Sequence, residues 1–159
     1  MSSLLVLHTN DLHGRLRPHQ AEKLRTLKMA QPNTLLVDAG VAVGSGDLGF
    51  HPWGERVLER MNAAGYDAMA LGNREFHPCR FALRLKIGKA RFPLLCANLR
   101  ARRGPTEEGV RSALLLPLPD GSRVALFGLL REMVREGSWA ARFSDFLFRE
   151  PLATAAEWT

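Results

Sequence analysis

The chain has 159 residues, 46% of them hydrophobic and 24% charged, which is the balance of an ordinary globular domain. No apolar run approaches the roughly 18 residues that a membrane-spanning helix needs, so we expect no membrane partner. The net charge of +6 favours anionic partners such as phosphate esters or nucleic acid. A genome rich in arginine codons, or adaptation to heat, is the simpler explanation for the 18 arginines, so a nucleic-acid partner has only charge in its favour.

The first eight residues contain neither a basic segment nor a small-residue cleavage site, so we expect no signal peptide and a cytoplasmic location. Cys79 and Cys96 are the only cysteines, and their spacing of seventeen positions matches no paired metal-ligand motif. We expect two reduced thiols rather than a disulfide framework.

Apolar runs of four to six residues alternate with helical patterns along the chain, which is typical of an α/β fold. In chain order, the patterns predict the strand Leu4–Leu7, the helix Ala21–Met29, the strand Thr34–Val37, the helix Trp53–Ala64, the strand Ala68–Leu71, a helix over residues 78–87 and the strand Pro93–Ala97. A hairpin follows, with strands Ser112–Leu116 and Arg123–Phe127 on either side of a Pro-Asp-Gly turn at 119–121. A short helix, the strand Phe146–Phe148 and a helix after Pro151 complete the series.

Residues 1–159 are expected to form one domain. The final helix has only about two turns after Pro151, which indicates a truncated domain. A sheet cut short in this way would expose apolar surface, so self-association is also expected.

Polar side chains follow three of the predicted strands. Asp11-Leu12-His13 comes after the first, Asp38-Ala39-Gly40 after the second and Gly72-Asn73-Arg74-Glu75 after the third. Ligands of α/β proteins gather at the carboxyl ends of the strands. An Asp and a His two residues apart can face one divalent ion, although a lone pair of this kind is weak evidence.

The residue order in and around these segments is far more specific than the residue types alone. The segments at residues 8–16, 33–40, 65–76 and 92–99 resemble, in order, signatures of the calcineurin-like metallophosphoesterases in their 5'-nucleotidase and UDP-sugar hydrolase branch. The resemblance covers at least residues 4 to 100. It implies an α/β fold, a reduced four-layer α-β-β-α sandwich with mixed sheets, and two divalent metals (Mn, Zn or Mg) at the strand ends. It also implies that Asp11 and His13 are ligands of the first metal and Asn73 a ligand of the second.

Three positions depart from the family pattern. Val41 stands where the family has an Asp that bridges both metals. Arg74 and His77 stand at the positions of the family's catalytic His-Asp pair, and the remaining family ligands come from a region beyond residue 159. With so few ligands, we expect a degenerate metal site and little or no hydrolysis by this chain alone.

Several side chains allow two interpretations. Arg74, together with Asn73, could bind a substrate phosphate in place of the missing metal charge, or Arg74 could pair with Asp11 or Glu75. Asp11 and His13 could be relics, Asn73 could hold a turn, and Asp47, His51 and His77 could be substitute ligands. His8 and His19 are expected to be structural, and the arginines at 100, 102 and 103 to lie in a solvated loop.

Two functions therefore compete. The first is a phosphomonoesterase or nucleotidase, completed by a second polypeptide that supplies the missing ligands. The second is a non-catalytic module that binds a phosphate-bearing small molecule such as a nucleotide, or a protein partner.

Overall fold

The computed structural model describes residues 3–106 and 109–159. A five-stranded sheet lies at its centre, with strand order β1-β2-β3-β4-β6 and every neighbouring pair parallel. The strands are β1 (Leu5–Thr9), β2 (Thr34–Asp38), β3 (Ala68–Ala70), β4 (Leu94–Leu95) and β6 (Val110–Arg111). The α/β class is thereby confirmed. No helix among the described residues is both long and apolar enough to cross a membrane.

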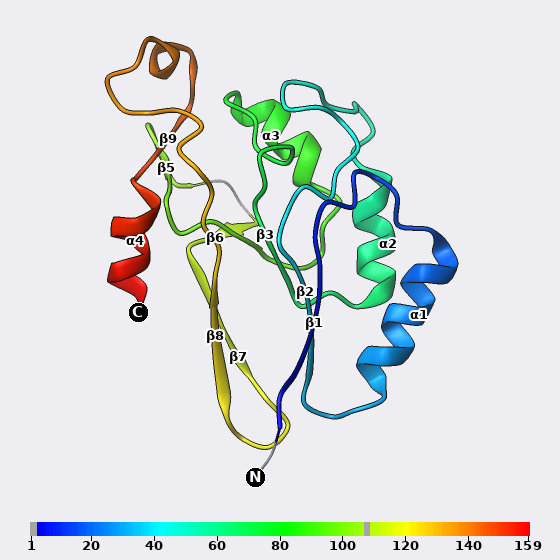
Figure 1. The fold of residues 1–159 in the computed structure, drawn as a ribbon. Coiled ribbons are helices and arrows are strands. Elements are labelled where there is room, and N and C mark those ends of the chain that lie inside the picture. The colour runs from blue at the N-terminus through cyan, green and yellow to red at the C-terminus, as the bar shows by residue number, and fades with distance from the viewer. Residues whose placement is uncertain (1–2, 107–108) are drawn as a thin grey trace.

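Three helices connect these strands: α1 (Pro18–Met29), α2 (Arg56–Ala64) and α3 (Arg80–Ile87). Figure 1 shows α1 and α2 side by side next to β1 and β2. Helix α2 buries Val57, Leu58 and Met61 on one face and ends at Gly65, whose φ of 80° permits a left-handed cap. It begins three residues later than predicted because Glu55 is extended and serves as the N-cap. Helix α1 begins three residues earlier because Pro18 opens it.

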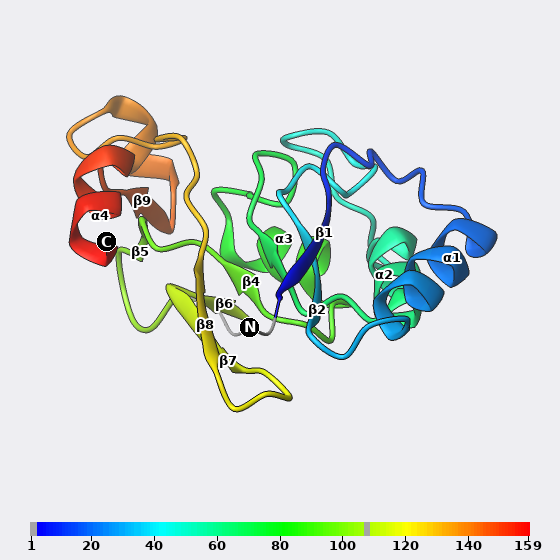
Figure 2. The ribbon, with the colours of Figure 1, turned by 60° about the horizontal axis from the view of Figure 1, so that its bottom comes forward.

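Antiparallel pairing occurs only in two separate ladders of the described chain. β5 (Leu99–Ala101) pairs with β9 (Phe146–Phe148), and β7 (Ala113–Pro117) forms the predicted hairpin with β8 (Arg123–Phe127). A 3-10 helix, η1 (Trp139–Phe143), and the final helix α4 (Pro151–Trp158) complete the structure. Figure 2 shows α4 and the β5–β9 ladder on the opposite side of the sheet from α1 and α2.

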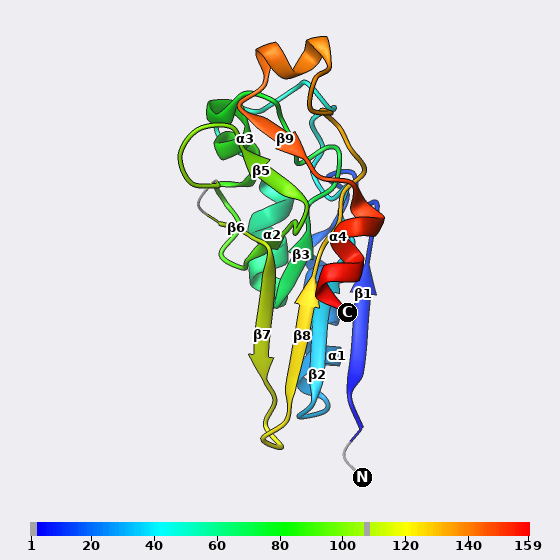
Figure 3. The same cartoon turned by 90° about the vertical axis from the view of Figure 1, so that its left-hand side faces the viewer.

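The two faces of the sheet are covered unequally. On the helix side, Leu36, Leu58 and Met61 are fully buried in one continuous core. On the other side, Val6 is 49% exposed, and an apolar cavity of about 280 Å³ lies between β2, β3 and β8. Figure 3 shows the β7–β8 hairpin reaching toward the end of the molecule at which β1 begins. Self-association through this face stays a prediction.

Gly128, directly after β8, lies against the central sheet. Its carbonyl oxygen accepts a hydrogen bond of 2.8 Å from the backbone N–H of Ala97. A Cβ at position 128 would overlap the carbonyl oxygen of Leu95, so only glycine permits this approach. This contact fixes the hairpin and the residues after it relative to β4.

We predict that Gly128→Ala lowers the free energy of unfolding by about 1–3 kcal/mol, because the added methyl group must displace backbone. Urea denaturation followed by circular dichroism measures the effect. Gly46→Ala is the matched control, since no atom lies within 4 Å of the added Cβ there. Equal stability of the two variants would contradict this account of the hairpin's attachment.

Candidate functional site

The loops that follow β1, β2 and β3 meet at one end of the sheet, at the top of Figure 1. Parallel pairing brings them together, because the register aligns Thr9 with Asp38 and Asp38 with Met69. The three polar segments of the sequence therefore lie at adjacent strand ends, as predicted.

Asp11 and His13 project from the first loop with left-handed backbone conformations, at φ 53° and 47°. Their N–H groups donate to the carbonyl oxygens of Gly40 and Val41, over 3.0 and 3.1 Å, which attaches this loop to the next one. A carboxylate oxygen of Asp11 lies 3.7 Å from Nε2 of His13, with the side chains 59% and 37% exposed. The two predicted ligands thus converge on one point at the surface.

Glu75 has a role that the sequence interpretation missed. Its side chain is fully buried, and its carboxylate accepts hydrogen bonds from the backbone N–H groups of Gly72, Val41 and Val43, over 2.9, 3.0 and 2.9 Å. Hydrogen bonds from N–H groups to an ionised carboxylate are charge-assisted and stronger than those between neutral groups. Glu75 therefore joins the loop after β3 to the loop after β2.

Val41 lies between the other two loops. Its N–H donates to Glu75, its carbonyl accepts from His13, and it packs against Gly72, where a Cβ would lie only 3.0 Å from a Val41 methyl carbon. Its φ of 63° is a strained conformation for a β-branched residue. The backbone at this position favours Gly, Asn or Asp, whereas the side chain present offers no lone pair.

Two further buried charges hold the rest of the loop after β2. The carboxylate of Glu55 accepts from the N–H groups of Gly44 and Ser45, over 3.1 and 3.3 Å. The fully buried Lys86 of α3 donates to the carbonyl oxygens of Gly46 and Asp47, over 2.7 and 3.1 Å. Burial lowers the pKa of Lys86, while the charges of Glu75 and Glu55 oppose that shift. These contacts fix the course of residues 44–47.

Asn73 and Arg74 extend from the loop after β3. The amide of Asn73 donates to the Asp47 carboxylate over 2.8 Å, so it holds the neighbouring loop. Arg74 makes one long contact, 3.5 Å to the carbonyl oxygen of Gly44, and forms no ion pair with any described residue. Arg74 therefore does not form the ion pair with Asp11 or Glu75 that the sequence offered as an alternative.

The side chain of His77, three residues before α3 begins, forms a hydrogen bond with the backbone. Its Nδ1 accepts from the N–H of Cys79 over 2.9 Å, and burial, with the charge of Lys86, lowers the pKa of its imidazole. Of the other candidates, His51 lies 3.9 Å from Glu55, His19 is exposed on α1 and His8 borders the cavity of the open sheet face.

Within residues 3–106 and 109–159, no group of three or more His, Cys, Asp or Glu side chains could hold a metal ion. Asp11 and His13 supply one pair of donors, and the Asn73 side chain is directed at Asp47. The donors of the described residues therefore do not fit a two-metal centre.

The arginine cluster is largely structural. Arg100 pairs with Glu136 over 3.0 Å, and Arg102 donates to the carbonyl oxygens of Ala141 and Ser144. Arg100 and Arg102 therefore have protein partners, and the prediction that Arg100 lies in a loop is wrong, because Arg100 belongs to strand β5.

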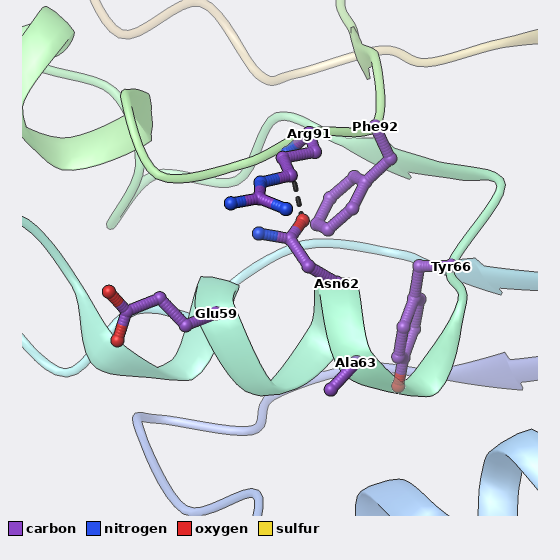
Figure 4. Close-up of a pocket in the computed structure, with 6 residues that line it drawn as sticks. All are labelled: Glu59, Asn62, Ala63, Tyr66, Arg91 and Phe92. Atoms are coloured by element: carbon purple, nitrogen blue, oxygen red, sulfur yellow. Dashed lines mark hydrogen bonds between the residues drawn. The ribbon is translucent and has the colours of Figure 1, made fainter.

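A separate cavity of about 390 Å³ lies between α2 and the loop before β4 (Figure 4). Glu59, Asn62, Tyr66, Arg91 and Phe92 line it. Asn62 accepts from the Arg91 N–H over 2.8 Å, and Glu59 pairs with Lys89 over 2.7 Å. The side chains of Glu59, Asn62 and Tyr66 thus already have protein partners, and this cavity is not part of the candidate site.

The comparisons with known proteins agree with this geometry. The chain is 36% identical to human 5'-nucleotidase over 145 residues, covering 76% of this chain and 25% of the human protein. It is 32% identical over 164 residues to the trifunctional nucleotide phosphoesterase YfkN of Bacillus subtilis, covering 81% of this chain and 11% of that protein. No family model matches.

Solved structures show the same fold. The 5'-nucleotidase precursor of Thermus thermophilus superposes with a TM-score of 0.75 and 26% identity, covering 98% of this chain and 33% of that one. The NAD nucleotidase of Haemophilus influenzae also gives 0.75, at 21% identity, over 98% of this chain and 31% of that one.

An α/β domain whose neighbouring parallel strands β1, β2 and β3 end in polar loops has the fold of these nucleotidases. The chain belongs to the calcineurin-like metallophosphoesterases, in their 5'-nucleotidase branch. It spans about a quarter of the length of the human 5'-nucleotidase and less of the Bacillus protein.

Asp38 provides a test of the site's electrostatics. Burial raises the pKa of its carboxyl to about 6, although hydrogen bonds from the Thr9 hydroxyl and the Gly40 N–H oppose the shift. Because the folded-state pKa is raised above the usual 3.8, folding favours the protonated acid. Its contribution to stability is therefore present below about pH 4 and lost as the pH rises through about 6.

We predict that Asp38→Asn removes this pH-dependent loss of stability, since the amide has the shape of the carboxyl group but does not ionise. Relative to the wild type, the variant should gain on the order of 2–3 kcal/mol between pH 4 and 7, measured by urea denaturation. If the difference in unfolding free energy between the variant and the wild type is the same at pH 4 and pH 7, Asp38 is not the titrating group.

Proposed function

We propose that this part of a 5'-nucleotidase-like phosphoesterase binds a phosphate-bearing small molecule, such as a nucleotide, and does not by itself carry out two-metal hydrolysis. The chain covers 25% of the human 5'-nucleotidase and 33% of the Thermus 5'-nucleotidase precursor, so the activity of those whole proteins does not transfer directly to it. A catalytic activity of a longer assembly, completed by further polypeptide, is the competing proposal.

The position of Val41 is the observation that carries the proposal. It contacts the loop of Asp11 and His13 through its carbonyl and approaches Gly72, next to Asn73, through its side chain. A carboxylate at this point could serve both groups of ligands, whereas a valine cannot coordinate an ion. Phosphoester hydrolysis through two metals depends on a shared, activated oxygen between them, and residues 3–106 and 109–159 supply no side-chain cluster to hold the ions at that spacing.

Arg74 supports the binding part of the proposal. A guanidinium has five N–H donors, and Arg74 uses one of them in a long contact with the carbonyl of Gly44. It carries a permanent charge beside Asn73, at the edge of the sheet where the three loops meet. It can therefore bind two oxygens of a phosphate group, but it cannot donate or accept a proton during a reaction.

The test combines turnover with binding. We predict that the purified chain, with Mn²⁺, Zn²⁺ or Mg²⁺ added, hydrolyses AMP and phenyl phosphate no faster than a metal-free sample. Inorganic phosphate should bind at millimolar concentration in an NMR titration, and Arg74→Ala should weaken that binding at least tenfold. Arg25→Ala, an exposed arginine on α1, is the matched control and should change nothing.

Metal-dependent turnover by the chain alone would refute the non-catalytic proposal and favour the enzyme. Phosphate binding that survives Arg74→Ala would refute the assignment of the anion site. A location in the cytoplasm stays a prediction.

A further inference from the structure

Four arginine side chains from three distant segments line one cavity of about 330 Å³. Its charged lining residues are Arg80, Arg102, Arg103, Arg142 and Asp145. None of the described residues that line it belongs to the three loops of the candidate site, so the cavity is a separate place on the molecule. Figure 1 shows the orange segment that contains η1 beside the β5–β9 ladder, on the side of the molecule away from α1.

Arg80 holds the loop after β5 in place. Its guanidinium donates hydrogen bonds to the backbone carbonyl oxygens of Arg103 and Pro105, each over 3.0 Å. The same group lies 5.1 Å from the ring centroid of Phe146 in β9, close enough for a cation–π contact. The backbone that carries Arg103 is therefore fixed at one wall of the cavity.

Arg102 fixes the opposite wall. Its guanidinium donates to the carbonyl oxygens of Ala141 and Ser144, which flank Arg142 in the chain. The segment that carries Arg142 is thus tied to the loop after β5. Two of the four arginines therefore hold the backbone on which the other two lie.

Arg103 and Arg142 have no protein partner of their own. Both are exposed, and within residues 3–106 and 109–159 neither side chain forms a hydrogen bond or an ion pair. Like charges held around one cavity repel each other, and an anion that binds between them offsets this repulsion. Each guanidinium also presents N–H donors in a planar fork that matches two oxygens of a phosphate group. These two side chains are therefore suited to bind an anion.

The carboxylate of Asp145 does not neutralise them. One of its oxygens accepts the backbone N–H of Arg80 over 2.8 Å, at the N-terminus of α3, where the helix dipole favours a negative charge. Asp145 forms no ion pair with an arginine of the described chain. Among the described lining residues, four guanidinium groups therefore stand against one carboxylate that is already bonded to backbone.

The shape of the cavity favours a compact polyanion. A volume of about 330 Å³ is at the lower end of the range for small-molecule sites. Proteins that bind nucleic acid through its backbone instead present a groove or stripe of positive charge. One phosphate group occupies one guanidinium fork, whereas Arg103 and Arg142 offer two.

We propose that this cavity binds a small ligand with two linked phosphate groups through Arg103 and Arg142. Such a group occurs in inorganic pyrophosphate and in nucleoside diphosphates. The site is separate from the phosphate position proposed at Asn73 and Arg74, and it does not depend on that proposal.

The experiment is an NMR titration of the Arg74→Ala variant with pyrophosphate, ADP and inorganic phosphate. The backbone amides of Phe143 and Ser144 report this cavity, whereas that of Asn73 reports the other site, so failures of the two proposals are distinguishable. At about 0.15 M salt, where exposed charges are screened, we expect pyrophosphate to bind roughly tenfold more tightly than inorganic phosphate at Phe143 and Ser144. Tighter binding of ADP than of pyrophosphate would identify a nucleotide as the source of the phosphates, and weaker binding would identify the inorganic ion.

Two further substitutions test the residues that carry the site. Arg103→Ala and Arg142→Ala should each weaken pyrophosphate binding roughly tenfold, and Arg142→Lys, which keeps the charge but not the fork, should retain part of the affinity. Because neither side chain bonds to the described protein, the urea midpoint should stay unchanged, which separates loss of binding from loss of folding. Arg123→Ala, at an exposed arginine of β8, is the matched control and should change nothing.

The site is refuted if pyrophosphate shifts neither amide, or if Arg103→Ala and Arg142→Ala bind it as tightly as their parent does. A single-stranded oligonucleotide that binds these amides as tightly as pyrophosphate would also overturn the proposal, because it would indicate a nucleic-acid surface instead.

Discussion

The candidate site depends on the hydrogen bonds that backbone N–H groups donate to the buried carboxylate of Glu75. It takes N–H donors from Gly72 on one loop and from Val41 and Val43 on another. No nearby water could replace these bonds, because the side chain is fully buried. Loss of one donor would leave a charge with an unsatisfied lone pair, which is costly in the interior. The strained φ of Val41 persists because the bonds on either side of it hold the peptide in place.

The backbone conformation of the three loops at this site does not depend on which side chains could bind a metal there. The left-handed conformations of Asp11 and His13, the bonds to Gly40 and Val41, and the close approach at Gly72 form one connected framework. That framework depends on main-chain groups and buried charges, so it does not require a carboxylate at position 41. The conformation of the three loops can therefore persist where the donors for two metals are absent from the described residues.

The sequence predicted the strands β1 to β3 and the positions of Asp11, His13 and Asn73, because parallel strands bring their carboxyl ends together. β5 and β6 were missed, since each contains an arginine and neither has a run of consecutive apolar residues, whereas the equally short β4 and β9 are apolar throughout. The roles of Glu75 and Lys86 were missed for a different reason: each bonds to backbone 30 or more residues away, and no local pattern encodes that. The arginine-lined cavity likewise joins three distant segments.

Amide hydrogen exchange of Val41, Val43 and Gly72, compared between the wild type and Glu75→Gln, tests the account most directly. In the variant an NH₂ group faces N–H donors, so we predict that all three amides lose protection together, by at least tenfold, while those of α2 do not. Glu59→Gln, which removes an exposed carboxylate, should leave the three amides unchanged. Retention of protection in Glu75→Gln would contradict the claim that this carboxylate holds the two loops of the site together.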